Sequence, residues 1–197
     1  MNKIYNSFNK KFKEKKIKIT DKVSIQESLI DINKTYEQYK GFKPNGIWYS
    51  FANLDSNSWI SFCIQKEMYN EIDLNKNYLY KFNISKKYYT IFNNKTILPI
   101  YFLIIRIRNF KDLYFFTEKY GIIEGKYLII DWIKVKEDGW SGIEFSPFFS
   151  LYTKINYKNH EKELIFLMKY LWYSSVDVSS GCIWNTELIK KIKISLI

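Results

Sequence analysis

The sequence predicts a single α+β domain built on mixed or antiparallel β-sheets with flanking helices. Segments with strand-like alternation and segments with helical spacing follow one another without regular βαβ units. The chain has 197 residues, of which 47% are hydrophobic, and this length is sufficient for one substantial core. We therefore expect one domain over residues 17–197, preceded by a basic arm at residues 1–16.

The first third of the chain predicts a strand followed by a helix. Residues 1–16 are polar and rich in lysine, which is typical of a short arm or a frayed helix. Alternating apolar residues predict a short strand over residues 17–20. Ser24 and Glu27 then have the spacing of a capping box, and apolar residues recur at helical intervals behind them. This pattern predicts a helix over residues 24–39.

An aromatic stretch at residues 47–51 is the segment around which the chain is organised. The Asn-Gly pair at residues 45–46 favours a turn, and the apolar run after it suits a buried strand. Asp55 or Ser56 can cap a helix that begins near Trp59. Such a strand, backed by a helix, can form one wall of a small-molecule cleft, although an aromatic strand is also ordinary core.

The remaining elements are predicted from alternation, helical spacing and capping residues. Asn109 and Asp131 can each begin a helix, with Gly121 and Gly139 at the respective ends. Apolar positions within residues 161–172 favour a further amphipathic helix. Strands are predicted over residues 78–84, 88–92, 99–107, 127–130, 142–148, 181–184 and 192–196.

A net charge of +11, with an isoelectric point near 9.4, produces a field that attracts phosphates. An anionic partner such as nucleic acid is therefore favoured. Beyond residues 9–16 the lysines are spread along the chain, so a concentrated basic stripe is not predicted.

Several classes of site and location are disfavoured by the composition. Cys63 and Cys182 suit neither a structural metal site nor a disulfide-rich fold, and the single His160 argues against histidine-based acid–base chemistry. The longest apolar run, residues 97–105, is too short to span a membrane, and the N-terminus lacks the apolar core of a signal peptide. We expect no metal, no membrane insertion and a cytoplasmic protein, in the virion or host cytoplasm if it is viral.

Three segments carry a resemblance to a known group of proteins. They are Lys43-Pro44-Asn45-Gly46-Ile47-Trp48-Tyr49-Ser50, then residues 131–144, then Val176-Asp177-Val178-Ser179-Ser180-Gly181-Cys182-Ile183-Trp184. Their order and spacing resemble a group of phage and bacterial proteins with the motifs KPxGLWxS and WDxxSGCIW. That group in turn is similar to the ADP-ribosyltransferase superfamily, a likeness at the level of the fold.

The resemblance implies a cleft between a split pair of small antiparallel sheets that holds NAD. The enzymes of this superfamily break the N-glycosidic bond of NAD and pass ADP-ribose to an acceptor, here an unidentified protein or nucleic acid. Mapped by motif, the aromatic wall and hydroxyl contact would come from Trp48, Tyr49 and Ser50, with Trp59 as a partner from the helix.

The carboxylate that stabilises the developing oxocarbenium ion would be Glu144 or Asp177. Glu144 can equally be an exposed strand carboxylate, and Asp177 can instead stabilise the turn before Gly181. The superfamily usually has Arg or His on the first strand, where this chain offers Lys18 or Thr20. The alternative is therefore an inactive basic protein on the same fold, which associates with nucleic acid or a virion.

Overall fold

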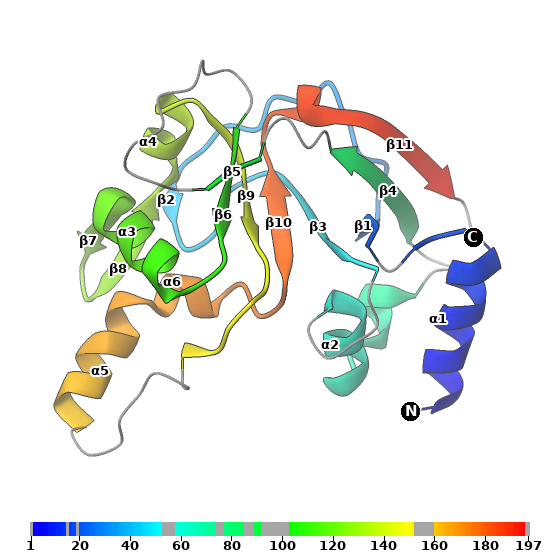
Figure 1. Ribbon diagram of the computed structural model, residues 1–197, viewed down its shortest axis with the longest axis horizontal. Helices are drawn as coiled ribbons and strands as arrows, with labels where there is room; N and C mark the ends of the chain where they lie inside the picture. Colours follow the sequence, from blue (N-terminus) through cyan, green and yellow to red (C-terminus); the bar gives the residue numbers. More distant parts are fainter. Residues whose placement is uncertain are drawn as a thin grey trace.

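The centre of the fold is an eight-stranded sheet with the order β11-β4-β1-β3-β10-β9-β6-β5, in the computed structural model (Figure 1). The structure describes residues 2–14, 16–18, 20–52, 58–73, 77–84, 89–91, 103–151 and 160–195. Strands from β11 to β9 pair antiparallel, whereas β9, β6 and β5 pair parallel. The strands are β1 (Lys22–Gln26), β3 (Ile47–Phe51), β4 (Tyr78–Ile84), β5 (Tyr89–Ile91), β6 (Leu103–Ile107), β9 (Trp140–Phe145), β10 (Ser180–Ile183) and β11 (Ile189–Ser195).

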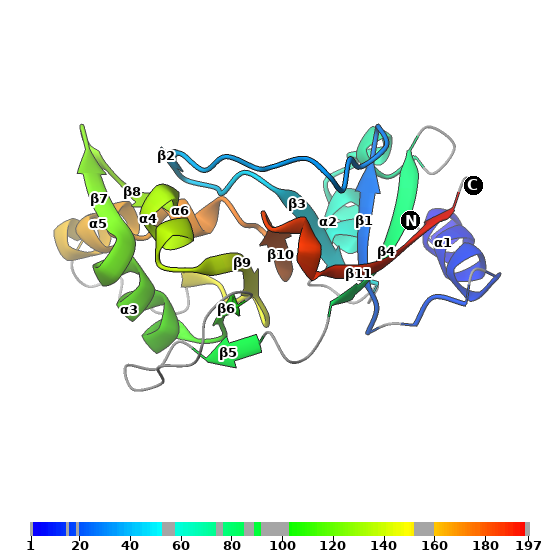
Figure 2. The ribbon, with the colours of Figure 1, turned by 90° about the horizontal axis from the view of Figure 1, so that it is seen from above.

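A smaller three-stranded sheet and most of the helices form the left lobe in Figure 1, while α1 and α2 lie on the right. The view from above shows the main sheet running between the two lobes (Figure 2). The predicted α+β class with mixed and antiparallel sheets is confirmed. These further elements are α1 (Asn2–Glu14), β2 (Lys40–Gly41), α2 (Trp59–Gln65), η1 (Tyr69–Ile72), α3 (Phe110–Tyr120), β7 (Gly121–Glu124), β8 (Tyr127–Asp131), α4 (Trp132–Glu137), α5 (His160–Lys169), α6 (Leu171–Ser174) and η4 (Thr186–Leu188).

The sequence motifs that lie far apart in the chain become three neighbouring strands, β3, β10 and β9. Tyr49 is opposite Gly181, which in turn is opposite Glu144 on the next strand. One residue along, Trp48 and Cys182 form the next pair. Because directly paired residues share a face and successive residues alternate, the Tyr49 row and the Trp48 row point to opposite sides of the sheet.

Two glycines allow close packing across these strands. A Cβ at Gly181 would stand 2.8 Å from Cε1 of Tyr49 and closer still to Cζ and the hydroxyl oxygen. A Cβ at Gly46 would lie 2.5 Å from the carbonyl oxygen of Ile183 and 2.7 Å from Sγ of Cys182. The motif glycines are therefore required by packing, because atoms of the neighbouring strand occupy the space of a methyl group.

Three hydrophobic clusters hold the elements on the sheet. The left-lobe cluster packs α3, α4 and α6 around Trp132 and Trp172, both with no exposed surface. On the right, Ile60 and Cys63 of α2 pack on Val23 of β1. The third cluster includes Tyr49 and lies on the other face of β3. The face that carries Trp48 is therefore bordered by two separate clusters, and the space between them is where a pocket forms.

The predicted helix caps at Asn109 and Asp131 are confirmed. The Asn109 side chain accepts a hydrogen bond from the backbone N–H of Asp112, and the Asp131 side chain accepts one from Lys134. A helix does begin at Trp59, but its cap is Ser58, whose Oγ accepts a hydrogen bond of 3.2 Å from the N–H of Ser61. Asp55 and Ser56, the predicted caps, lie outside the described residues.

The prediction of a strand over residues 17–20 and a helix over residues 24–39 is wrong. The first strand begins at Lys22, and β1 pairs with β3 on one side and β4 on the other. Residues 27–39 form no helix, and Leu29 is 60% exposed, so the apolar spacing does not mark a buried helical face. Strand pairing on both edges of β1 outweighs the local capping pattern.

The basic arm at residues 1–16 contains a helix, α1, whose Phe12 is buried against the right-hand cluster. Each later predicted strand overlaps an observed one, within the ranges that the structure describes. The helix predicted over residues 161–172 is divided at Tyr170 into α5 and α6. The predicted strand positions 88, 92, 99–102 and 196 lie outside the described residues.

No helix in the described part of the chain combines the length and apolar character needed to cross a bilayer.

Candidate functional site

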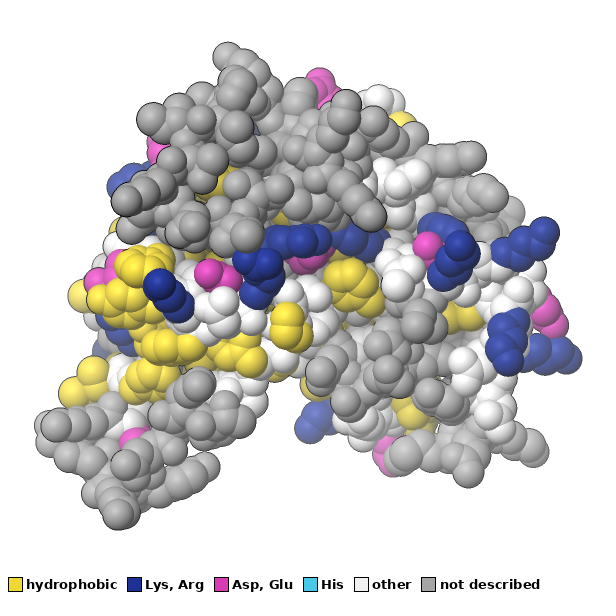
Figure 3. Space-filling model, in the orientation of Figure 1, with side chains coloured by type: hydrophobic (Ala, Val, Ile, Leu, Met, Phe, Trp, Pro, Cys, Tyr) yellow, Lys and Arg dark blue, Asp and Glu magenta, His cyan; other side chains and the backbone are white. Residues whose placement is uncertain are grey.

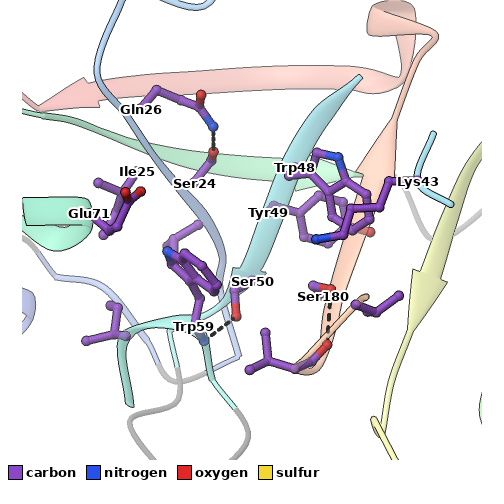
Figure 4. A pocket seen from close by; sticks show the side chains of 14 residues that line it. Ser24, Ile25, Gln26, Lys43, Trp48, Tyr49, Ser50, Trp59, Glu71 and Ser180 are labelled. Carbon is purple, nitrogen blue, oxygen red and sulfur yellow. Dashed lines mark hydrogen bonds between the residues drawn. The ribbon is translucent and has the colours of Figure 1, made fainter. Parts of the chain in front are cut away.

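A pocket of about 350 Å³ lies on the Trp48 face of the sheet, above β1 and β3 and beside α2 (Figure 4). Four residues predicted from the sequence line this pocket: Trp48, Tyr49, Ser50 and Trp59. The turn, strand and helix at residues 45–65 therefore do form one wall of a cavity. Its volume is at the lower end of the range for small-molecule sites, which is enough for one ring system and an attached sugar.

Ser50 connects the three elements that shape the pocket. Its hydroxyl donates a hydrogen bond of 3.1 Å to the carbonyl oxygen of Ser179 and accepts one of 3.0 Å from the backbone N–H of Trp59. Ser180 lies beside it and donates from its hydroxyl to the carbonyl oxygen of Val178. These bonds join β3 to the start of α2 and to the turn before β10, so the wall of the pocket is held in place.

The pocket combines aromatic surfaces with charge at its rim. Lys43 is exposed, and its ammonium lies 5.6 Å from the ring centroid of Trp48. Trp59 is partly buried and stacks on Phe62 of the same helix, with 5.6 Å between the ring centroids. Glu71 of η1 also lines the cavity. Two indole rings, a cation and a carboxylate suit a planar heterocycle that carries charged or hydroxyl groups.

Glu144 lies on the opposite side of the sheet, in a buried cluster of charged and polar groups. Its side chain is 3% exposed and bonds to the ammonium of Lys22. Its Oε1 is 3.1 Å from Nε of Arg106, and its Oε2 accepts a hydrogen bond of 2.9 Å from the Tyr49 hydroxyl. The Glu144 carboxylate is thus not the exposed strand carboxylate that the sequence allowed as an alternative. It also does not line the Trp48 pocket.

Burial controls the protonation of the groups around Glu144. It raises the pKa of Tyr49 well above the usual value, and the adjacent negative charge of Glu144 raises it further. Burial lowers the pKa of Lys22, and the Glu144 carboxylate opposes that change. Tyr49 therefore stays protonated and donates its hydrogen bond to Glu144. Because Tyr49 belongs to β3, this bond connects the strand that lines the pocket to the charged cluster on the other side of the sheet.

Asp177 and Thr20 lie outside this arrangement. Asp177 is exposed and has a left-handed backbone with φ 64° in the turn before β10, as expected for a short acidic residue in a turn. Its neighbours Val176 and Val178 line the pocket, whereas Asp177 itself is not among the lining residues. Thr20 is exposed and precedes β1, and it does not line the pocket.

Sequence reasoning missed four charged groups. Lys22 was missed because the predicted first strand ended at residue 20, whereas β1 begins at Lys22, and its ammonium pairs with Glu144 behind the sheet. Arg106 had a usable signal, since a lone charge inside an apolar run must be paired if the strand is buried. Lys43 begins the first motif segment, but the motif assigned it no role, and Glu71 had no signal, because only the tertiary fold brings these two residues to one cavity.

Basic side chains occur at several separate places on the face shown in Figure 3, in agreement with the even spread of lysine along the sequence. Among the residues that the structure describes, no cluster of three or more His, Cys, Asp or Glu side chains could hold a metal ion. Cys63 and Cys182 are both buried free thiols.

The fold and the pocket together define a mixed α+β protein with an aromatic cavity and charges of both signs at its rim. Comparisons of the chain with protein-family models, with curated proteins and with solved structures find no match.

Proposed function

We propose that this protein binds NAD, with the nicotinamide half in the Trp48 pocket, and that it is an ADP-ribosyltransferase-like protein. The observation that carries this proposal is the position of Trp48, Ser50 and Trp59, which the family resemblance pointed to and which line one cavity. A cavity of about 350 Å³ accommodates the nicotinamide and its ribose, while the second nucleotide would extend outside. The net charge of +11 favours the pyrophosphate.

The reaction proposed is transfer of ADP-ribose to an acceptor on a protein or nucleic acid. The bond between C1′ and the pyridinium nitrogen breaks, and neutral nicotinamide leaves with the electron pair. A nucleophilic oxygen or nitrogen of the acceptor forms the new bond to C1′ and releases its proton to solvent. A nearby carboxylate stabilises the positive charge that develops on the ribose.

Asp177 is the better placed of the two predicted carboxylates, because its flanking residues line the pocket. Glu144 is engaged by Lys22, Arg106 and Tyr49 behind the sheet. Its proposed role is therefore to position Tyr49 and the strand that carries the pocket. Asp177→Asn retains a residue that tolerates the left-handed backbone, and Glu144→Gln retains the shape of the buried side chain.

Binding is tested by calorimetric titration of the purified protein with NAD. Trp59→Ala should weaken binding at least tenfold, since it removes an aromatic wall. Tyr114→Ala provides the matched control, because Tyr114 is an aromatic side chain, 40% exposed, on α3 outside the pocket. Equal affinity of both variants and the wild type would refute the assignment of the pocket.

Transfer is tested by release of nicotinamide in the presence of cell extract as a source of acceptors. Asp177→Asn should abolish release while NAD still binds. Glu144→Gln should lower the thermal midpoint of unfolding, and the fraction that remains folded should still release nicotinamide. Loss of release in Glu144→Gln alone, with unchanged binding and stability, would identify Glu144 as the catalytic carboxylate.

A second function is a non-catalytic protein that associates with nucleic acid or another anionic assembly. The observation that favours it is the complete engagement of Glu144 by its own neighbours, together with the charge of +11. Binding to single-stranded DNA that weakens as salt rises, with no NAD binding, would support it. Binding to DNA that is insensitive to salt would contradict this electrostatic mechanism.

A further inference from the structure

The two ends of the Trp48 pocket carry opposite charges. Of the described residues that line it, Lys43 is the one base and Glu71 the one acid. Figure 4 shows Glu71 on one side of Trp59 and Lys43 on the other side, in front of Trp48. Lys43 follows β2 and Glu71 belongs to η1, so different elements bring these charges to one cavity.

Aromatic surface lies between the two charges. Trp59 projects into the pocket from α2, and the Trp48 ring lies beneath the Lys43 side chain (Figure 4). The face of an indole ring attracts cations as well as stacking on planar groups. The combination of an indole and a nearby carboxylate at the Glu71 end is therefore suited to a flat, positively charged ring.

Nicotinamide provides such a ring in one of its oxidation states. The pyridinium of NAD⁺ carries a positive charge, whereas the dihydropyridine of NADH is neutral and otherwise nearly the same in size. Lys43 at the other end of the pocket suits a phosphate, which both forms carry. A pocket with these charges discriminates between the two forms at the ring end only.

We infer that Glu71 selects the oxidised form of the dinucleotide, with the pyridinium ring between Glu71 and Trp59 and the adjacent phosphate at Lys43. This inference rests on the proposed function and adds a specificity-determining residue to it. Glu71 touches the ring without taking part in bond breaking, so its removal changes which form binds and leaves binding of the neutral form intact.

The experiment is calorimetric titration of the full chain with NAD⁺ and, separately, with NADH. The wild type should bind NAD⁺ about tenfold more tightly than NADH. Opposite charges about 5 Å apart favour association about fourfold in bulk water and about two hundredfold at the lower dielectric constant near a protein surface, and the exposed Glu71 lies between these limits. Glu71→Gln should reduce the ratio to within about twofold, mainly by weakening NAD⁺. Lys43→Gln should weaken both forms to a similar extent and leave the ratio unchanged.

Matched variants separate this effect from a general loss of charge. Glu67→Gln makes the same change at an exposed residue between α2 and η1 that does not line the pocket, and its ratio should equal that of the wild type. Lys111→Gln matches Lys43→Gln, because Lys111 also lies over an aromatic ring, at 5.9 Å from the Phe115 centroid, outside the pocket. Neither control should change affinity.

The outcomes distinguish the inference from the function on which it rests. Equal affinity of the wild type for NAD⁺ and NADH, or an unchanged ratio in Glu71→Gln, would overturn the role of Glu71 while NAD binding stands. Failure of the wild type to bind either form would overturn both. A ratio that falls equally in Glu67→Gln would show a long-range charge effect and would also overturn the inference.

Discussion

Gly181→Ala is expected to destabilise the protein strongly, because the space beside Gly181 is filled by the Tyr49 ring. The new methyl group would lie 2.8 Å from Cε1 of Tyr49 and nearer still to Cζ and the hydroxyl oxygen, well inside contact distance. Tyr49 is 2% exposed, and its hydroxyl is bonded to Glu144, so the ring has little room to move. The substitution must either strain the sheet or displace the phenol from the carboxylate.

The size of the effect follows from these two alternatives. Overpacking a well-filled interior costs about 1–3 kcal/mol. Displacing the phenol removes a hydrogen bond to a charged group, which is worth about 1.5–3 kcal/mol. The free energy of unfolding, measured by urea denaturation, should therefore fall by about 1–3 kcal/mol. Gly41→Ala is the control, because its nearest neighbour would be a Tyr39 side-chain atom at 3.4 Å, and it should change stability by less than about 0.5 kcal/mol.

A double-mutant cycle with Tyr49→Ala tests the cause directly. Removing the ring opens the space for a methyl group at residue 181, so Gly181→Ala should cost at least about 1 kcal/mol less in that background than in the wild type. An equal cost in both backgrounds would show that Tyr49 is not the reason for the glycine. A wild-type unfolding curve for Gly181→Ala would refute the reasoning altogether.

Four further predictions concern a helix cap, a turn and the two thiols. Ser58→Ala should lower the free energy of unfolding by about 1 kcal/mol through loss of the cap of α2, and an unchanged urea midpoint would contradict this cap. Asp177→Val should cost about 1–2 kcal/mol at its left-handed φ of 64°, whereas Asp177→Asn should be nearly neutral in the same assay. Burial raises the pKa of Cys63 from 9.0 to about 12, so the stability contributed by its protonated form below pH 9 should be lost as the pH rises toward 12, and this decline should be smaller in Cys63→Ala. Both cysteines should resist a thiol reagent at pH 8 until the chain unfolds, because burial also raises the pKa of Cys182 well above its usual value.

The predictions that succeeded rest on short-range chemistry. Asn109 and Asp131 cap the helices after them because a side-chain oxygen reaches a backbone N–H three residues ahead, a contact that depends on local sequence alone. The strand at residues 78–84 alternates in burial from Tyr80 to Ile84, because its two faces meet different surroundings there, and that alternation is visible in its residues. In such segments the local preference and the tertiary environment agree.

The incorrect helix over residues 24–39 shows where local chemistry is insufficient. Ser24 and Glu27 have the spacing of a capping box, yet Ser24 lies in β1 and pairs with Tyr80 of β4. Strand partners on both edges supply hydrogen bonds and burial that the isolated helix would lack. Local spacing does not reveal partners as distant along the chain as Ser50 for Val23 and Tyr80 for Ser24, so this competition is decided only in the folded chain.

The sequence by itself determined the α+β class, the capped helices and the aromatic segment that lines the pocket. Tertiary structure alone decided that Glu144 would be enclosed by Lys22, Arg106 and Tyr49 on one side of the sheet, while Trp48 and Ser50 line a pocket on the other. The physical reason is strand register, since the pairing of Tyr49 with Gly181 and of Gly181 with Glu144 fixes which side chains share a face.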